Sequence, residues 1–259
     1  MEFKTVELFT NEDVTTIVLN RPDAMNAMNL TMFEELEMAL KRIEDTRVLI
    51  ITGKGKAFSS GADMALVNFL RALPPTEFME RLRYLQSVIM MVEELNVPVI
   101  AAINGYAVGG GLDLALACDL RIATEEAKLG EHYVRVGVIP DLGGTLRLAR
   151  VVGLGRAKEM IFLGEMITAL EAERIGLVNR VVPQDRFESE TKALALRIAT
   201  GPSVAHRMAK KAIHGGLDGG TRIGMEMEVF GQKICMESED VKEGIASFHE
   251  KRPPKFQGK

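Results

Sequence analysis

Hydrophobic and polar residues follow two different periods in the first part of the chain. Residues 6–8 and 14–19 have the pattern of short strands, and the polar turn between them predicts a hairpin. From Leu30 onward the apolar positions fall at helical spacing, and residues 47–52 then form an apolar run. The pattern therefore predicts two strands, a helix and a buried strand in succession.

The same order of elements returns further along the chain. Residues 76–95 predict a long amphipathic helix, and residues 97–103 predict a second buried strand. A glycine-rich turn then opens another helix near Gly110. Because strands and helices alternate in this way, we expect an α/β fold.

Beyond Gly144 the pattern becomes almost wholly helical, with one short strand predicted at residues 178–182. The last quarter, from about residue 197, contains three further helical segments that have no strand between them. We therefore divide the chain into a core, residues 1–196, and a C-terminal helical layer, residues 197–259. The adjacent prolines 253 and 254 predict an extended tail.

Composition places the chain among ordinary soluble globular proteins. Its 259 residues are enough for one large core, and 32 basic against 36 acidic residues give a net charge of −4. That balance provides no basic surface for nucleic acid. The uncharged stretch 96–112 is too short and too interrupted by proline and glycine to span a bilayer. With two cysteines and no secretory pattern, we expect a cytoplasmic protein with neither nucleic-acid nor membrane partners.

Several common catalytic motifs are absent from the sequence. The glycine-rich stretch 105–111 has neither the G-x-G-x-x-G spacing nor a P-loop, which argues against a nucleotide cofactor. Ser59 and Ser60 do not lie in a G-x-S-x-G turn, although a hydrolase with one of them as nucleophile remains an alternative. The four histidines lack metal-ligand spacing. We therefore expect neither a metal nor a separate cofactor.

Two turns of small residues are the strongest local signals for chemistry. Residues 59–64 and 109–113 each follow a predicted strand and lead into a predicted helix. Small residues let a ligand approach the backbone, and a helix begins with free N–H groups that carry partial positive charge. Two such turns favour an oxyanion hole. The alternative is that the glycines only permit tight turns.

Four longer motifs make the interpretation more specific. They are LNRPDAMNA (19–27), AFSSGAD (57–63), PVIAAINGYAVGGG (98–111) and IPDLGGT (139–145). In order and spacing they resemble the signatures of the crotonase family, the enoyl-CoA hydratases and isomerases. Residues 244–252 also resemble the closing helix of that family. The resemblance implies a superhelix of ββα turns, a C-terminal helical layer for trimerisation, and an acyl-CoA substrate bound by a homotrimer or a dimer of trimers.

The resemblance also assigns binding residues. The backbone N–H groups of Ala62 and Gly110 match the two oxyanion donors of the family. For Lys251 a simple surface charge is the alternative interpretation. The positions that match contacts to the CoA moiety are Ala24, Met25, Ala27, Ser60, Asp63, Met64, Phe248 and Lys251.

The sequence departs from a hydratase at both catalytic glutamates. The first position holds Asp113, whose side chain is one methylene shorter, and the second holds Tyr133. A phenol with a reference pKa of about 10 is a poor base at neutral pH, so ordinary hydration is disfavoured. We expect Tyr133 to be a hydrogen-bond donor or a wall of the pocket. Glu131 is expected to be a surface charge, with a substitute catalytic carboxylate as the alternative.

Asp141 is the better candidate for the working carboxylate. It occupies the position where the family members that shift a double bond place their acid/base residue; its alternative role is to cap the following helix. The favoured reaction is therefore isomerisation of 3-enoyl-CoA to 2-enoyl-CoA. The alternatives are a 2-enoyl-CoA hydratase that uses Asp113, and an acyl-CoA-binding homologue without activity.

Overall fold

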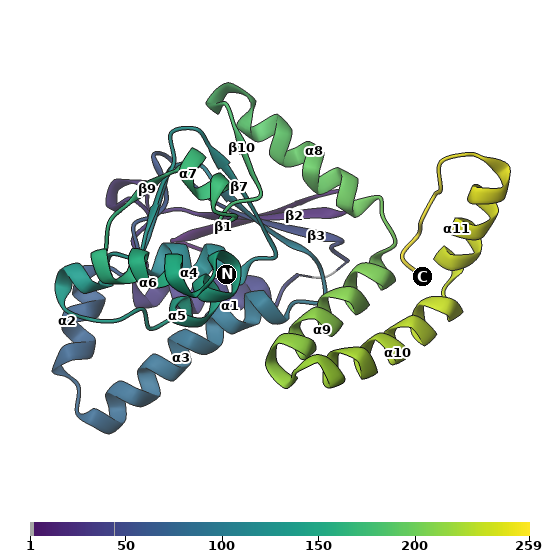
Figure 1. The fold of residues 1–259 in the computed structure, drawn as a ribbon. Helices are drawn as coiled ribbons and strands as arrows, with labels where there is room; N and C mark the ends of the chain where they lie inside the picture. Colours follow the sequence, from purple (N-terminus) through teal and green to yellow (C-terminus); the bar gives the residue numbers. More distant parts are fainter. Residues whose placement is uncertain (1–2, 44) are drawn as a thin grey trace.

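The computed structural model describes residues 3–43 and 45–259. Figure 1 shows two sheets covered by helices, and a helical arm that extends from one end of this body. The fold is the predicted α/β class.

The larger sheet has six strands in the order β1-β2-β3-β5-β7-β10. β1 and β2 form the predicted antiparallel hairpin, and every later pair in this sheet is parallel. The apolar runs of the central strands β3 and β5 are buried almost throughout, as expected for parallel strands that helices cover on both faces. The six strands are β1 (Val6–Asn11), β2 (Val14–Leu19), β3 (Val48–Gly53), β5 (Val99–Ile103), β7 (Leu120–Thr124) and β10 (Arg180–Val182).

A smaller sheet has four strands in the order β4-β6-β8-β9. Strands β4 (Ala57–Ser59), β6 (Tyr106–Val108) and β8 (Lys128–Gly130) are parallel, and β9 (Ile167–Thr168) is antiparallel to β8. Each of the first three follows a strand of the larger sheet, and β4 and β6 lead on to helices. This repetition is the predicted superhelix of ββα turns. Strands of two or three residues are too short to show a period, so β8 and β9 were not predicted.

Helices of the core pack on both faces of the larger sheet. Phe33 of α1, Ile89 of α3 and Leu112 of α4 belong to the main buried cluster, whereas Phe187 and Ala195 of α8 pack on the opposite face. These helices are α1 (Leu30–Leu40), α2 (Met64–Ala72), α3 (Pro75–Glu94), α4 (Gly110–Ala117), α5 (Gly144–Val152), α6 (Leu154–Leu163), α7 (Ala169–Arg174) and α8 (Phe187–Ala199).

The arm consists of α9 (Ser203–Gly219), α10 (Thr221–Glu237) and α11 (Glu239–Glu250). Three residues separate α9 from the end of α8, and the boundary drawn from the sequence at residue 197 lies within α8. Two buried or half-buried cations attach α9 to the body. Lys210 Nζ lies 2.8 Å from Asp119 Oδ2, and Arg47 Nε donates to Ser203 Oγ at 2.7 Å.

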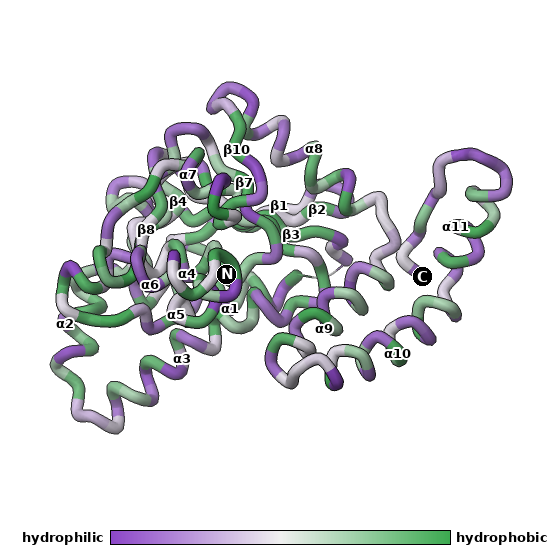
Figure 2. Tube along the Cα trace, in the orientation of Figure 1, coloured by the Kyte–Doolittle hydropathy of each residue, from purple (hydrophilic) through white to green (hydrophobic). Residues whose placement is uncertain are grey.

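Much of the apolar surface of the arm is exposed. In Figure 2 hydrophobic and hydrophilic positions alternate along α9 and α10. Phe230 is 69% exposed and Ile223 is 49% exposed in the single chain. The sequence predicts that both are buried against the core or a neighbouring subunit; the core does not bury them. Among the described residues, no helix is both long enough and apolar enough to cross a bilayer.

Candidate active site

Three neighbouring strands of the smaller sheet end beside one another, and each leads into a segment predicted to be functional. β4 is followed by Ser60 and Ala62, β6 by Gly110, and β8 by Glu131 and Tyr133. Because β4, β6 and β8 are parallel, their carboxyl ends meet at one edge. Ligands of α/β proteins commonly bind at such an edge.

Close backbone packing joins the two glycine turns. A Cβ atom on Gly111 would lie 2.3 Å from the carbonyl oxygen of Ser59, and a Cβ atom on Gly61 would lie 2.7 Å from that of Val108. Gly61 also has a φ of +96°, which side chains strongly disfavour. The glycines thus do more than allow each turn to be tight, because they also bring the two turns into contact.

The contact leaves two N–H groups free at neighbouring positions. Gly110 is the first residue of α4, so its N–H has no acceptor within the helix. The N–H of Ala62 has no acceptor among the described residues, whereas the next N–H, of Asp63, donates to Met28 O at 3.0 Å. A Gly61 Cβ would lie 3.3 Å from Gly110 N, which shows how close the turns are. This arrangement can stabilise a negatively charged oxygen.

Residues 24–28 run along the first of these turns. Met28 N donates to Gly61 O at 2.7 Å, and Ser60 N donates to Met25 O at 3.0 Å. Met25 and Met64 remain 38% and 57% exposed. One rim of the site therefore carries six of the residues predicted to contact CoA: Ala24, Met25, Ala27, Ser60, Asp63 and Met64.

Asp63 makes contacts that stabilise this rim. Its Oδ1 accepts a hydrogen bond from Ala65 N at 2.9 Å and so caps α2, and its Oδ2 lies 2.9 Å from Arg21 Nη1. These two contacts hold the pKa of the Asp63 carboxyl below its usual value, the Ala65 N–H having the larger effect. Both carboxylate oxygens are thus engaged within the chain.

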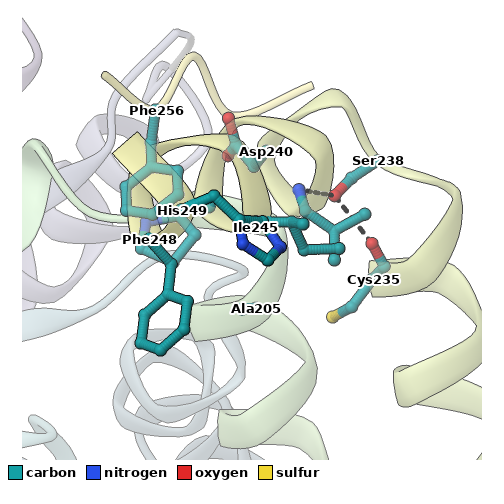
Figure 3. A pocket seen from close by; sticks show the side chains of 11 residues that line it. Ala205, Cys235, Ser238, Asp240, Ile245, Phe248, His249 and Phe256 are labelled. Atoms are coloured by element: carbon teal, nitrogen blue, oxygen red, sulfur yellow. Dashed lines mark hydrogen bonds between the residues drawn. The ribbon is translucent and has the colours of Figure 1, made fainter. Parts of the chain in front are cut away.

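The other two predicted CoA contacts lie elsewhere. Phe248 lies on α11 and Lys251 ends that helix, whereas Figure 1 shows α11 at the far end of the arm from α2 and α4. Phe248 is 82% exposed, and Figure 3 shows it projecting from α11 near His249 and Phe256. Within one chain the structure does not bring these residues to the glycine turns.

Asp113 lies one helical turn after Gly110 and is 0% exposed. The Tyr133 hydroxyl donates a hydrogen bond to Asp113 Oδ2 at 2.5 Å. The ring of Tyr133 lies 3.6 Å from the point where a Gly109 Cβ would stand, and its hydroxyl lies 3.5 Å from the corresponding point of Gly110. Tyr133 therefore lies against the second glycine turn, with Asp113 buried beyond its hydroxyl.

Glu131 is 0% exposed, so the prediction that it is a surface charge is wrong. Its side chain enters the interior directly after β8 and lies beneath the first residue of α5, Gly144. A Cβ atom there would be 1.9 Å from Asp113 Oδ1 and 3.1 Å from Glu131 Oε1. Burial raises the pKa of Asp113 to about 7, and burial and the nearby Asp113 raise that of Glu131 well above its usual value.

Asp141 lies in the loop before α5 and is half-buried. The N-cap of α5 is Gly143, and in the described part of the chain no side-chain capping bond is made to this helix. The alternative in which Asp141 caps the helix is therefore wrong. Gln86 Nε2 of α3 donates to the Asp141 carbonyl oxygen at 2.7 Å and fixes the loop. Burial raises the pKa of the Asp141 carboxyl, and the Tyr133 hydroxyl partly opposes this rise.

The structure also bears on the alternatives of a serine nucleophile and a metal site. Ser59 is 0% exposed, and its hydroxyl donates to Asn26 O at 2.8 Å and accepts from Gly61 N at 3.2 Å. It is thus not presented as a nucleophile. Within residues 3–43 and 45–259, no three His, Cys, Asp or Glu side chains are grouped so that they could hold a metal ion.

Sequence reasoning missed Arg147, a cation close to the buried carboxyl groups. Arg147 Nε donates to Glu93 Oε2 at 2.8 Å, Nη1 donates to Leu142 O at 2.8 Å, and its charge lowers the pKa of Asp113. Arg147 looks like an ordinary charged position of a helix in the sequence. Its effect on Asp113 becomes visible only in the structure, where α3, α4 and α5 lie close together.

Known proteins that are similar to this chain identify its family. A profile of the enoyl-CoA hydratase/isomerase family matches residues 10–259. The chain is 39% identical to the crotonyl-CoA hydratase of Syntrophomonas wolfei over 99% of both chains, and 39% identical to the short-chain-enoyl-CoA hydratase of Clostridium acetobutylicum over 97% of both. The crystal structure of enoyl-CoA hydratase from Bacillus anthracis superposes with a TM-score of 0.91 at 39% identity, covering 99% of this chain and all of that one. The chain therefore belongs to the enoyl-CoA hydratase/isomerase family, the crotonase family of enzymes.

Proposed function

We propose that this enzyme isomerises a 3-enoyl-CoA to a 2-enoyl-CoA, with Asp141 as its acid and base. The observation that carries the proposal is the contrast between two carboxyl groups. Asp113, at the usual hydratase position, is 0% exposed and bonded to Tyr133, whereas Asp141 is half-buried and its carboxyl group does not cap α5. Asp141 is thus the carboxylate better placed to meet a substrate.

The proposed reaction needs one carboxylate and two hydrogen-bond donors. Asp141 removes a proton from Cα, and the electron pair of that C–H bond shifts the double bond from Cβ–Cγ to Cα–Cβ through a dienolate. Negative charge collects on the thioester oxygen, where the N–H groups of Ala62 and Gly110 would donate to it. Asp141 then returns the same proton to Cγ. Substrate and product are isomers, so no co-reactant and no cofactor beyond the CoA of the substrate take part.

The raised pKa of Asp141 suits this role. A carboxylate at its ordinary pKa is a weak base for a carbon acid, and a base becomes more effective as its pKa approaches the working pH. Burial raises the pKa of Asp141 in this direction. The loop also holds the residue against α3 through Gln86, so the carboxylate is positioned before substrate binds.

Hydration of a 2-enoyl-CoA is the second candidate, because relatives 39% identical to this chain are named hydratases. Hydration requires a base for the attacking water and a second group for the Cα proton. Asp113 would have to supply one of them, although it is buried behind Tyr133. The third candidate function is binding of an acyl-CoA without turnover.

Two isosteric variants test the proposal. Asp141→Asn is expected to lower isomerase kcat by at least about 100-fold, because a general base is lost while the binding contacts remain. Titration calorimetry with a saturated acyl-CoA should show nearly unchanged affinity. If Asp141→Asn stays active while Asp113→Asn abolishes hydration of a 2-enoyl-CoA, hydratase is the correct function. Binding without turnover of either substrate would support the homologue without activity.

We also propose that the enzyme works as a trimer or a dimer of trimers. The exposed apolar side chains of α9 and α10, among them Phe230 and Ile223, provide a surface that a second subunit can bury. In such an assembly Phe248 and Lys251 could reach a site of another subunit. Light scattering at micromolar concentration should give a multiple of three chains; a monomer would contradict the proposal.

A further inference from the structure

Glu131 is a buried carboxyl group that the proposed reaction does not use. It is 0% exposed, and neither of its oxygens meets a hydrogen-bond donor in the described part of the chain. An ionised carboxylate buried without donors would cost several kcal/mol. Glu131 is therefore neutral, and the hydrogen of its carboxylic acid needs an acceptor.

Asp113 provides that acceptor. Its Oδ1 is buried and also has no donor among the described residues, and the two carboxyl groups meet beneath Gly144. Tyr133, the Leu142 N–H and the Arg147 charge all favour the ionised form of Asp113, and the start of α5 adds partial positive charge. Within the described residues, no such group stabilises the ionised form of Glu131. The shared proton therefore belongs to Glu131 and the negative charge to Asp113.

Tyr133 connects this pair to the proposed base. Its hydroxyl bonds to Asp113 at 2.5 Å, and it is also close enough to Asp141 to lower the pKa of that carboxyl group. A phenol has one proton, so it can donate to only one of the two carboxylates at a time. While Asp113 is ionised it retains this proton, and Asp141 stays the stronger base.

We propose that Glu131, as a neutral carboxylic acid, donates a hydrogen bond to Asp113 and thereby keeps the Tyr133 proton on Asp113 and away from Asp141. Glu131 is then a positioning residue that acts through two others. The inference rests on the proposed function only where it takes Asp141 as the base. The buried hydrogen bond between Glu131 and Asp113 does not depend on the reaction.

This arrangement gives the enzyme a defined pH response. When pH falls through about 7, Asp113 takes up a proton and no longer holds the hydroxyl of Tyr133, which turns to Asp141. Asp141 becomes a weaker base and kcat/KM falls. The titratable and charged groups around Glu131 and Asp113 are Tyr133, Asp141, Arg147 with its partner Glu93, and His132, whose pKa burial lowers.

Two substitutions of similar size at Glu131 separate the hydrogen bond from packing. Glu131→Met removes the hydrogen-bond donor to Asp113, so the pKa of Asp113 rises. The pH at which kcat/KM falls on the acidic side should then increase by about one unit, because one hydrogen bond contributes about that much to a pKa. Glu131→Gln keeps a donor, so it should leave the limb within about 0.3 units. If both variants behave alike, the proposal is wrong.

The same comparison in a Tyr133→Phe background tests whether Glu131 acts on Asp141 through Tyr133. Without the phenolic proton, the difference between Glu131→Met and Glu131→Gln should disappear. A purely structural role for Glu131 would leave the difference unchanged and overturn the proposal.

Infrared spectroscopy gives a readout that does not depend on activity. At pH 8 the C=O band of a protonated carboxylic acid should be present in the wild type and absent from Glu131→Gln. If the band persists in Glu131→Gln, the proposal is wrong, and this test remains available even if Glu131→Met fails to fold. If the band behaves as expected but Asp141→Asn remains active, the hydrogen bond stands and only the proposed function fails.

Discussion

The candidate active site has two halves, one formed by backbone groups and one by titratable side chains. One half is backbone: the turns that carry the N–H groups of Ala62 and Gly110 can adjoin because Gly61 and Gly111 lack a Cβ atom, which would collide with a neighbouring carbonyl oxygen. The other half consists of titratable side chains: Asp113, Glu131, Tyr133 and Asp141. The backbone half depends on the space that glycine leaves and is insensitive to pH. The side-chain half depends on where a few protons lie.

The largest expected effect comes from breaking the backbone half with Gly111→Ala. The new Cβ would lie 2.3 Å from Ser59 O, a backbone atom that cannot move by a simple side-chain rotation. The start of α4 must shift, and Gly110 N shifts with it. Loss of one oxyanion donor typically lowers kcat by about 100- to 1,000-fold. Steady-state kinetics over the whole accessible pH range should show this loss at every pH.

Gly155→Ala is the matched control for this substitution. Gly155 also lies in the first turn of a helix, α6, but a Cβ atom there would meet nothing within 4 Å. Alanine has the higher helix propensity, so the control should be neutral or more stable by up to about 1 kcal/mol. If Gly111→Ala behaves like Gly155→Ala, close packing does not hold the two turns in place.

The side-chain half is tested by Gly144→Ala, for which a smaller effect is expected. The added Cβ would lie 1.9 Å from Asp113 Oδ1, so the carboxyl group must move within a buried site. Overpacking of this kind costs about 1–3 kcal/mol of stability. A displaced Asp113 holds Tyr133 less well, so kcat should fall by about tenfold, or about 1.4 kcal/mol. Unlike the loss in Gly111→Ala, this loss should vary with pH.

The contrast between the halves also explains how much of the molecule the sequence predicts. The buried strands and the two glycine turns have strong local signatures in the sequence, and the structure brings the turns that hold Ala62 and Gly110 side by side. The hairpin and the long α3 were likewise predicted to within a few residues. All of these features follow from hydrophobic period or from glycine, both of which are local properties.

Features that depend on distant neighbours were not predictable in this way. Glu131 has the sequence of an exposed charge, yet it is buried because β8 ends beneath α5, an element that begins after a separate loop. Asp141 has the sequence of a helix cap, but Gly143 takes that place. Whether a charged residue is buried depends on which groups surround it in space. The hydrophobic pattern of one segment does not specify those groups.

A third prediction follows from the raised pKa of Asp113. In the unfolded chain its pKa is about 3.9, whereas burial raises it to about 7 in the folded protein. Between these values the folded state binds a proton that the unfolded state does not, so this group makes stability fall as pH rises from about 4 to about 7. Asp113→Asn removes the contribution, and its free energy of unfolding should depend less on pH.

Urea unfolding between pH 5 and pH 8 measures this dependence. The exposed Asp185 provides the control, since Asp185→Asn changes a carboxylate in contact with solvent. Equal pH slopes for the wild type and Asp113→Asn would show that Asp113 does not take up its proton on folding in this range. The side-chain half would then lack the pH sensitivity that distinguishes it from the backbone half.

The smallest expected effect concerns Asp63, a titratable residue inside the backbone half. Its carboxylate caps α2 and pairs with Arg21 at a partly exposed position. Asp63→Ala removes both contacts and should lower the free energy of unfolding by about 1–2 kcal/mol, mostly through the lost cap. Asp63→Asn keeps a capping oxygen and loses only a screened ion pair, so about 0.5 kcal/mol is expected. Thermal unfolding measures the difference between the two variants. Were Asp63→Asn instead to raise the KM for acyl-CoA by tenfold or more at unchanged stability, Asp63 would bind CoA directly, and the first turn would contribute a side chain as well as backbone to the site.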